Sequence, residues 1–556
     1  RVKPMAERAA AVPPDDALVS SSVSMAAGTV ASRITGMVRD IVLVAAIGFG
    51  VFGDTYTIAN TLPNIVYILI AGGALNAVFI PQLVRRMTED TDDGAGFADR
   101  LITLVIVLLI AVAAVAVLVA PAIIALYGPS TWTAADSGNA VLFARFCLPQ
   151  VIFYGMFAVF SQVLNARGSF IAPMYAPIAS NIVVIASAVG FLAVAGTRDP
   201  QSATVPTSAI VLLGLGTTLG IAVQALVLLP VMARAGYRWR PRTSFRGYGL
   251  RRSGGLAGWT FLFVLTNQLA LIVVTRLAAA ANVVASQDPG LQSVGYTSYT
   301  RAYLLFVLPH SVITVSIVTF LLPRMSRAAS DGDDAAVSRD VGQGALLAGS
   351  VLLPMAVVLF VTGPRVAELL FGYGAATSAQ AALVGTVLQA FLVGLLPFTV
   401  FYVVLRGFYA YEDTRTPALV NLVMTAGYVV IALALYAAVP AQWKVPALAL
   451  AYGLSYAMGT PVAWRLLSRR THGLPSARVA QGFARMTLAC VGCALAAVVV
   501  VVGLGPVLGQ SRAADAVVVL FAALLGSGAY YLIARRLHIH EVDDVVRQLA
   551  GRLVRK

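Results

Sequence analysis

The chain has few charged residues for its length. Only 11% of its 556 residues are Asp, Glu, Lys or Arg, whereas soluble domains contain about 25%. Hydrophobic residues make up 59% of the sequence, and the mean hydropathy is +0.85. These values exclude an ordinary soluble domain, and apolar runs of about 20 residues or more indicate a polytopic membrane protein.

Residue types that carry catalysis or bind metals are also scarce. The three cysteines (Cys147, Cys490 and Cys493) give no disulfide framework, and only four histidines are present. The sequence contains no paired carboxylates, no histidines at metal-ligand spacing, no Ser/His/Asp arrangement and no phosphate-binding glycine loop. We therefore expect a transporter rather than an enzyme, with no metal and no cofactor, and leave open coupling to a monovalent cation.

The apolar runs predict an all-α fold with fourteen transmembrane helices. Their approximate ranges are 20–46, 54–87, 98–122, 137–165, 172–195, 206–234, 250–282, 294–328, 338–364, 378–408, 415–438, 445–468, 480–505 and 512–536. Several ranges exceed the ~20 residues that a span needs, so we expect tilted helices or extensions beyond the membrane.

The formal net charge of +15 could suggest a nucleic-acid partner, but the distribution of the charges argues against one. Most Lys and Arg residues fall in the terminal segments and even-numbered loops, whereas the opposite loops hold Arg198, Arg365, Lys444 and Arg512. This asymmetry predicts that both termini are cytoplasmic. The densest cluster, from Arg234 to Arg252, suits anionic lipid headgroups. A partner protein or a substrate headgroup is the alternative.

Short motifs recur at a nearly constant offset. Pro81 and Pro323 are 242 residues apart, Leu62-Pro63-Asn64 recurs as Leu308-Pro309-His310 at an offset of 246, and Pro177 matches Pro417 at 240. The offset predicts two parallel six-helix repeats around a central cavity. We expect a cytoplasmic segment at 1–19, an N-lobe at 20–234, a basic linker at 235–249, a C-lobe at 250–468, two extra helices at 480–536 and an amphipathic cytoplasmic tail at 537–556.

Four arginines inside predicted spans are the strongest functional signal. Arg33 and Arg39 lie in the first span, Arg276 in the seventh and Arg301 in the eighth. A guanidinium at mid-membrane depth costs about 2.5–3.5 kcal/mol on insertion scales, so we expect these side chains to face one shared, wet central space. Guanidinium groups match phosphate oxygens in two-point fashion, which suits a diphosphate. A pairing of Arg39 with Asp40 is the alternative.

Other charged residues in the spans are rare. Arg145 opens the fourth span and is read as an anchor that reaches the outer interface. Asp54 begins the second span, whereas the seventh, eighth, eleventh and twelfth spans contain no Asp or Glu. The absence of acidic residues argues against a carboxylate proton relay in the second half.

The stretch SRITGMVRD, followed by GFGVFGDTYTIANTLPNIVYILIAGGALNAVFIPQLVRR, resembles the start of the MurJ (MviN) lipid II flippase family. That family belongs to the superfamily of multidrug, oligosaccharidyl-lipid and polysaccharide exporters. The similarity extends more loosely through TRAYLLFVLPHSVITVSIVTFLLPRMSR, FGYGAAT and YAYEDTRTPALVN. It implies fourteen spans in a bacterial plasma membrane and transfer of an undecaprenyl-diphosphate-linked peptidoglycan precursor from the inner to the outer leaflet.

The resemblance also implies roles for particular residues. It gives headgroup-binding roles to Arg33 and Arg39, essential status and a place in the substrate site to Asp54, and a functional role in the second lobe to Arg301. The assignment of Arg276 to the substrate site follows instead from its expected burial in the seventh span.

The chain departs from many relatives in two ways. Tyr67 and Gly72 stand where those relatives have Arg and Glu, so a less charged cavity is expected. Some relatives bind sodium through acidic residues in the seventh and eleventh spans, where this chain offers the neutral oxygens of Asn267, Asn421 and Thr425. These neutral side chains argue against sodium coupling.

The sequence thus predicts a lipid II flippase that works by alternating access and is driven by the membrane potential or an ion gradient. The alternatives are a flippase for another polyprenyl-diphosphate oligosaccharide, a drug or solute antiporter of the same superfamily, and a scaffold that recruits cell-wall enzymes. Expected partners are the lipid substrate, the membrane, and cell-wall synthesis or division proteins bound through cytoplasmic loops.

Overall fold

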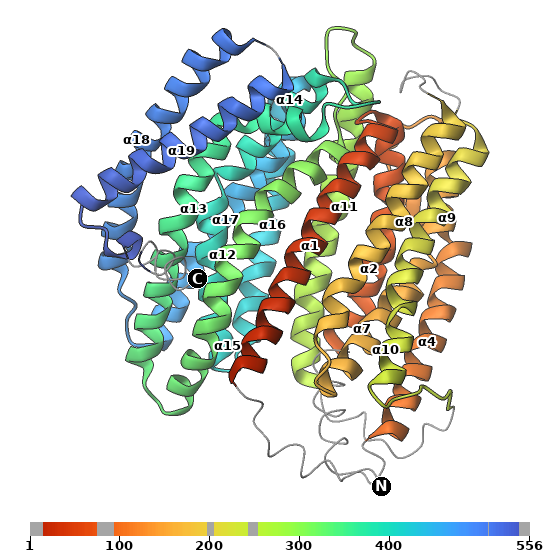
Figure 1. Ribbon diagram of the computed structural model, residues 1–556, viewed down its shortest axis with the longest axis horizontal. Helices are drawn as coiled ribbons and strands as arrows, with labels where there is room; N and C mark the ends of the chain where they lie inside the picture. The colour runs from red at the N-terminus through yellow and green to blue at the C-terminus, as the bar shows by residue number, and fades with distance from the viewer. Residues whose placement is uncertain are drawn as a thin grey trace.

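The structure is a computed structural model that describes residues 15–74, 94–196, 205–242, 254–509, 511–543 and 547. Regular secondary structure in these ranges is helical (Figure 1). The helices are α1 (Asp15–Ile47), α2 (Val51–Ala74), α4 (Ala95–Leu118), α5 (Ala120–Tyr127), α6 (Ala134–Cys147), α7 (Gln150–Ala166), α8 (Ile171–Ala195), α9 (Thr207–Leu226), α10 (Leu228–Arg234), α11 (Gly254–Ser286), α12 (Tyr296–Ser330), α13 (Asp334–Phe371), α14 (Ser378–Leu392), α15 (Leu395–Ala410), α16 (Arg415–Ala438), α17 (Lys444–Arg470), α18 (Ser476–Leu508) and α19 (Arg512–Arg536), with a 3₁₀ turn η3 at Ala441–Trp443.

The all-helical polytopic fold is confirmed. A helix satisfies its backbone hydrogen bonds internally, which a chain in lipid requires. Within the described ranges ten helical segments are long and apolar enough to span a membrane, or eleven with the bent pair α14–α15. The predicted spans at 20–46, 54–87 and 445–468 fall on α1, α2 and α17, outside those eleven, and the second half of 54–87 lies outside the described residues. The count of fourteen stays a prediction.

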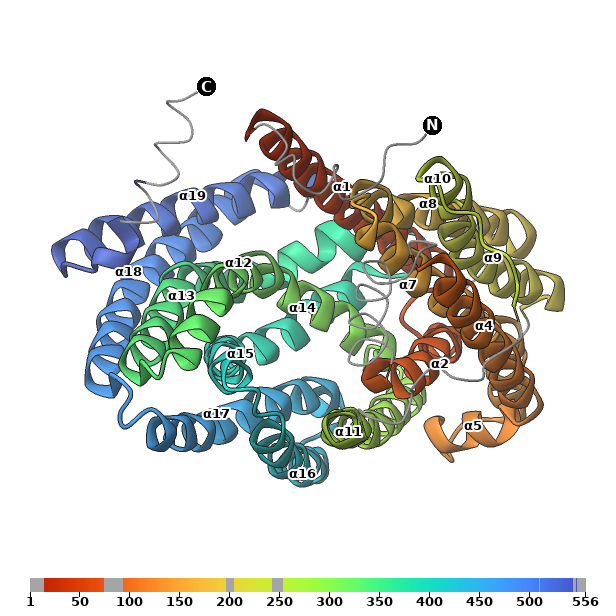
Figure 2. The ribbon, with the colours of Figure 1, turned by 90° about the horizontal axis from the view of Figure 1, so that it is seen from below.

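The helices form two groups with a seam between them. Helices α1, α2 and α4–α10 lie on one side and α11–α17 on the other, and we keep the names N-lobe and C-lobe for them (Figure 2). Viewed from below, α1 and α11 lie on opposite flanks of the seam. Helices α18 and α19 pack against each other and against α13, on the far side of the C-lobe.

Both lobes interrupt a long span at equivalent places. The segment α6–α7 breaks between Cys147 and Gln150, and α14–α15 breaks between Leu392 and Leu395. The breaks are 245 residues apart. Each segment also begins with a capping box, in which a threonine side chain and the side chain three residues later satisfy each other's backbone N–H; the pairs are Thr133 with Asp136 and Thr377 with Gln380.

A pair of asparagines makes the same contacts in each lobe. Asn181 on α8 donates from Nδ2 to Thr35 Oγ1 at 2.9 Å and to the Ser32 carbonyl at 3.3 Å. Asn421 on α16 donates from Nδ2 to Thr266 Oγ1 at 3.0 Å and to the Phe263 carbonyl at 3.4 Å. In both lobes the acceptors are a threonine on the first helix and the carbonyl three residues before it, which supports the predicted duplication.

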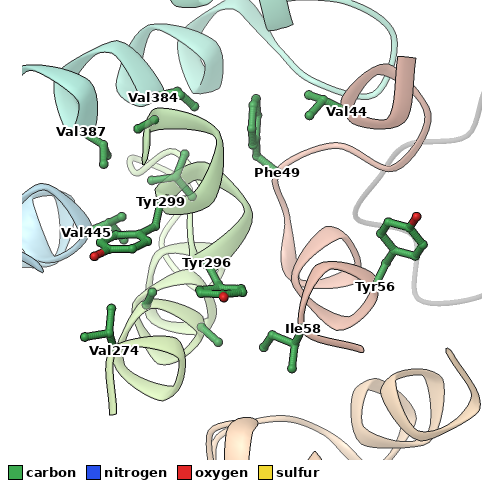
Figure 3. Packing of buried hydrophobic residues seen from close by; sticks show 14 of the residues in the cluster. Val44, Phe49, Tyr56, Ile58, Val274, Tyr296, Tyr299, Val384, Val387 and Val445 are labelled. Atoms are coloured by element: carbon green, nitrogen blue, oxygen red, sulfur yellow. The ribbon is translucent and has the colours of Figure 1, made fainter. Parts of the chain in front are cut away.

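One apolar cluster continues across the seam. Figure 3 shows Phe49 and Ile58 on the N-lobe side and Tyr296, Tyr299 and Val384 on the C-lobe side, all of them buried in this cluster. Two further contacts join the lobes nearby: the N–H of Ala375 donates to the Ala45 carbonyl at 2.8 Å, and the rings of Phe49 and Phe371 meet edge to face. The lobes are therefore closed against each other at the end where α1 finishes and α2 begins.

The start of the basic linker is held against α4. Tyr237 donates its hydroxyl to Asp99 at 2.8 Å, and Arg242 pairs with the same carboxylate at 3.4 Å. Burial and the hydrogen bond to Asp99 raise the pKa of Tyr237 above its ordinary value. Residues 1–14 of the predicted N-terminal segment, residues 243–249 of the linker, and most of the predicted tail lie outside the described residues.

Close glycine contact fixes α17 against the α14–α15 break. A Cβ built on Gly394 would lie 2.3 Å from the Cα of Gly453, and one built on Gly453 would lie 2.9 Å from the Cα of Gly394. Small residues permit such close approach between membrane helices. Tyr452, which lines a cavity described below, stands beside this contact.

We predict that Gly453→Ala lowers the stability of the folded protein by about 1–3 kcal/mol, because the added methyl meets backbone atoms that cannot move away. The measurement is thermal unfolding of the purified protein in detergent. Gly503→Ala on α18 is the matched control, since a Cβ there meets nothing within 4 Å. Equal melting temperatures for the two variants would contradict the packing argument.

Candidate functional site

A polar cavity of about 200 Å³ lies at the seam between the lobes. Helices α1, α2, α7, α8 and α9 of the N-lobe and α12 of the C-lobe line it. The lining residues are Arg39, Asp40, Leu43, Tyr56, Thr57, Asn60, Thr61, Gln150, Tyr154, Val184, Thr217, Ile221, Thr300 and Arg301. We call it the central cavity.

Two arginines share one carboxylate in the central cavity. Asp40, which is 4% exposed, lies 3.1 Å from Arg39 Nη2 and 3.0 Å from Arg301 Nη1. Arg39 belongs to α1 and Arg301 to α12, so the carboxylate links the two lobes. A buried charge needs a partner, and here two cations share one anion. The cluster therefore keeps a formal net charge of +1.

Hydrogen bonds hold the two arginines in place, and some of their N–H groups remain without a partner in the described chain. Arg39 Nη1 also donates to Asn181 Oδ1 at 3.1 Å, and its side chain is 32% exposed. Arg301 Nε is buried and has no hydrogen-bond partner within the described chain, and the same is true of Gln150 Oε1. A buried donor without a partner costs about 1–3 kcal/mol, so an anion that enters the cavity gains a donor already in place.

Arg33 lies apart from this cluster. It is exposed, and its Nη1 donates to Ser311 Oγ on α12 at 2.5 Å. Six residues separate it from Arg39, which is about 9 Å along a helix. Arg33 thus crosses the seam at a second level, on the N-terminal side of the cavity along α1.

Arg276 does not share the central cavity, contrary to the expectation from its place in the seventh span. Its Nη1 donates to the carbonyls of Ala125 and Leu126 on α5, at 2.7 and 3.0 Å. It lines a separate cavity of about 760 Å³ together with Arg145. The reason is the position of α11 on the flank of the seam, where it meets α2 and α5.

Asp54 lies at the closed end of the seam rather than in the central cavity. It is fully buried and accepts hydrogen bonds from the backbone N–H groups of Tyr296 (3.1 Å) and Thr297 (2.7 Å), and from Asn282 Nδ2 (2.7 Å). The carboxylate of α2 therefore caps the N-terminus of α12, where an anion is stabilised by the unsatisfied N–H groups and the helix dipole. Gly295 permits this approach, because a Cβ there would lie 2.1 Å from Asp54 Oδ2.

The predicted neutral oxygens lie in the C-lobe, at or beside a third cavity. Asn267 and Thr425 line this cavity of about 440 Å³. Asn421 does not line it, and its Nδ2 donates to Thr266 and Phe263. Asn267 Nδ2 donates to the Phe263 carbonyl at 2.8 Å. The cavity walls are rich in tyrosine, with Tyr296, Tyr299, Tyr303, Tyr428, Tyr452 and Tyr456. Thr300 lines both this tyrosine cavity and the central cavity, so the two adjoin.

Sequence reasoning missed several of these features. Asp40 was considered only as a neighbour of Arg39, and its bond to Arg301 joins positions 261 residues apart. Asn282 carries no sequence signal, because an isolated asparagine in an apolar run is usually a packed polar group. The tyrosines come from three helices, α12, α16 and α17, and no spacing in the sequence reveals that these helices bring them together.

We predict that Asp54→Asn loosens the closed end of the seam, because a neutral amide cannot replace the carboxylate that accepts from two backbone N–H groups. Labelling of an Ala376→Cys reporter, buried at this end, by a water-soluble maleimide should rise about tenfold, since hydrogen bonds to charged groups contribute about 1.5–3 kcal/mol. Asp515→Asn, whose carboxylate pairs with Arg365 away from the seam, is the control. Unchanged labelling in Asp54→Asn would show that this carboxylate does not hold the lobes together.

Comparisons with known proteins agree on a family. The family model described as lipid II flippase MurJ matches residues 43–512. The lipid II flippase MurJ of Burkholderia cenocepacia is 26% identical over 396 residues, covering 70% of this chain and 72% of the relative. The probable lipid II flippase MurJ of Vibrio cholerae serotype O1 is 25% identical over 423 residues, covering 74% and 77%.

Solved structures show the same fold. The structure titled lipid II flippase MurJ, inward closed conformation, superposes with a TM-score of 0.71 at 17% identity, over 93% of this chain and 99% of that one. An inward-facing multidrug resistance MATE family transporter of the MOP superfamily superposes with a TM-score of 0.59 at 15% identity, over 79% and 94%. The fold is thus that of MurJ and MATE transporters. Because the family model spans most of the sequence, the chain is a multi-pass membrane transporter that belongs to the MurJ family of lipid II flippases.

Proposed function

We propose that the protein moves lipid II from the inner to the outer leaflet by alternating access, and that the diphosphate of the lipid binds Arg39 and Arg301 in the central cavity. The observation that carries this proposal is the sharing of Asp40 by two guanidiniums from different lobes. The cluster has a net positive charge, its donors are already positioned, and Arg301 Nε has no partner within the described chain.

The size of the cavities suggests how a large headgroup is divided between them. The central cavity, at about 200 Å³, is below the roughly 300–1,000 Å³ of typical small-molecule sites and suits a compact diphosphate. The adjoining tyrosine cavity of about 440 Å³ offers ring faces and hydroxyls to a less charged part of the headgroup. The prenyl chain stays in lipid. Arg33, with its exposed guanidinium, would meet the headgroup on its way to the cavity.

Alternating access requires the lobes to part at the end where they now meet. In the proposed fourteen-span arrangement, with two six-helix repeats and both termini in the cytoplasm of a bacterial cell, that end faces outward. The cap that Asp54 forms on α12 and the contact between Ala375 and Ala45 would then hold the outer side shut. Outward opening breaks these contacts, which gives Asp54 a role in the transport cycle without contact to substrate.

The net charge of the site determines how the membrane potential affects each step of transport. The empty cluster carries +1, and a bound diphosphate diester adds about two negative charges, so the loaded site carries about −1. Each unit charge that crosses 100 mV changes the free energy by about 2.3 kcal/mol. A potential that is negative inside therefore favours both outward movement of the loaded site and inward return of the empty one.

Two further expectations from the sequence remain proposals. A monovalent cation could bind the neutral oxygens of Asn267 and Thr425 beside the tyrosine rings, although the residues that line this cavity include no Asp or Glu. Cell-wall synthesis or division proteins could bind the cytoplasmic loops. A drug-cation antiporter of the same fold is disfavoured because its substrate would meet the positive cluster at Asp40.

We predict that Arg39→Ala and Arg301→Ala each abolish transport while the protein still inserts and folds. Each change removes one of the two guanidiniums that would bind phosphate. The measurement is depletion of the native protein in cells that carry the variant, with leaflet-resolved labelling of lipid II. Arg485→Ala, an exposed arginine of α18 outside all three cavities, is the control. Normal outward delivery by both cavity variants would refute the site.

We predict that Asp40→Asn removes the voltage dependence of the outward step, because the loaded site then carries no net charge. The measurement is a single turnover of fluorescent lipid II in proteoliposomes under an imposed potassium diffusion potential, read by quenching with an impermeant reductant. The wild-type rate should increase with inside-negative potential, and Asp515→Asn should behave like the wild type. The same voltage dependence in Asp40→Asn and wild type would contradict the charge assignment.

A further inference from the structure

Another candidate site lies between the lobes on the flank opposite α1. It is the cavity of about 760 Å³ lined by α5, α6 and the connection between them, and by Arg276 of α11. Figure 2 shows α5 and α11 on that flank. Arg276 lies ten residues before the end of α11, about 15 Å along the helix, and Asn282, further along the same helix, contacts Asp54 at the closed end. The cavity therefore belongs to the same half of the molecule as the closed end of the seam.

The polar side chains of this cavity supply mainly hydrogen-bond donors. Arg145 and Arg276 bring two guanidiniums, and the residues that line the cavity include no Asp or Glu. Trp132 is 8% exposed, and its indole Nε1 has no hydrogen-bond partner within the described chain. Ser130 and Ser137 add two hydroxyls. An indole N–H can only donate, so its missing partner is an acceptor.

The walls of the cavity are held in place by the fold. Arg276 donates to the last carbonyls of α5, which fixes its stem while its remaining N–H groups stay available. Gly128 allows the Trp132 ring to lie against the chain, since a Cβ at Gly128 would be 2.7 Å from that ring. The capping box of Thr133 begins α6 directly after the tryptophan. The donors are therefore positioned before any ligand arrives.

Apolar surface next to the cavity points to a lipid. Leu126, which follows the lining residue Ala125 on α5, is 50% exposed, and Val284, two turns beyond Arg276 on α11, is 38% exposed. A phosphate bound by the two arginines would leave attached hydrocarbon lying along this surface. Guanidinium groups bind phosphate oxygens in two-point fashion, and that geometry adds strength as well as specificity.

We propose that this cavity is a second phosphate site, which binds the phosphate group of a lipid in the half of the membrane that the lipid substrate reaches after transfer. The inference rests on the proposed function for its sidedness, and it assigns Arg145 and Arg276 to a site separate from Arg39 and Arg301. Two lipids share the required chemistry: the exported diphosphate lipid and an anionic phospholipid of the bilayer.

The test is equilibrium binding of radiolabelled undecaprenyl diphosphate to the purified full-length protein in detergent. Wild-type protein and the Arg485→Gln control should bind two equivalents. The double variant Arg145→Gln/Arg276→Gln and the double variant Arg39→Gln/Arg301→Gln should each bind one. Trp132→Phe should weaken the second site about tenfold, a loss of about 1.4 kcal/mol. Two equivalents in the Arg145/Arg276 variant, or a single wild-type equivalent that the Arg39/Arg301 variant abolishes, would overturn the proposal.

Competition then identifies the source of the phosphate. Displacement from the second site by phosphatidylglycerol, with none by phosphatidylcholine, assigns it to an anionic membrane lipid, and no displacement by either assigns it to the exported lipid. Equal displacement by inorganic phosphate would overturn the lipid assignment. Because Arg276→Gln also removes hydrogen bonds to α5, Arg145→Gln alone provides a variant that leaves those bonds intact, and thermal unfolding checks that each variant is folded. The transport assay of the Arg39 and Arg301 variants judges the proposed function independently of this result.

Discussion

The interaction on which the rest of the site depends is the pairing of one buried carboxylate with guanidiniums from two lobes. Asp40 lies in a region where an unpaired charge would be unstable, so Arg39 and Arg301 must stay near it. One carboxylate balances the charge of only one of the two arginines, so the cluster keeps one uncompensated positive charge. The seam therefore carries a fixed positive charge.

At the closed end of the seam a buried carboxylate is again stabilised by a partner from the other lobe, but the partner is a helix N-terminus. There the buried carboxylate of Asp54 pairs with no arginine of the described residues, and the N-terminus of α12 provides the compensating backbone N–H groups. Both contacts join α1 or α2 to α12. Helix α12 thus receives one carboxylate at its first turn and another one turn and a half later at Arg301, so any movement of this helix relative to the N-lobe changes both contacts together.

The matching asparagine contacts show how two similar lobes can differ in chemistry. Asn181 donates to Thr35 and Ser32 on α1, and Asn421 donates to Thr266 and Phe263 on α11. The acceptors on α11 lie 231 residues after those on α1. The same offset pairs Arg39 with Ala270. The oxygen of Asn181 accepts from Arg39, whereas the C-lobe has a buried alanine at the corresponding place and a tyrosine-lined cavity beside it. At this equivalent position the N-lobe thus carries a charged side chain and the C-lobe neutral surface, and the charge that the C-lobe contributes to the cluster comes from Arg301 on α12.

The helical membrane fold can be read from the sequence alone, because an apolar run in lipid has to satisfy its own backbone hydrogen bonds. It also singled out Arg39 and Arg301, since a permanently charged group inside such a run is costly unless it has polar surroundings. Which charges meet depends on how the helices pack. Arg276 has the same sequence signature as Arg301, yet its place on the flank of the seam turns it to the carbonyls of α5 and towards Arg145. Asp54 looked like part of a substrate site and instead caps a helix 242 residues away. The packing of the helices sets which way each side chain points. The sequence of one helix does not show which neighbouring helix a given side chain contacts.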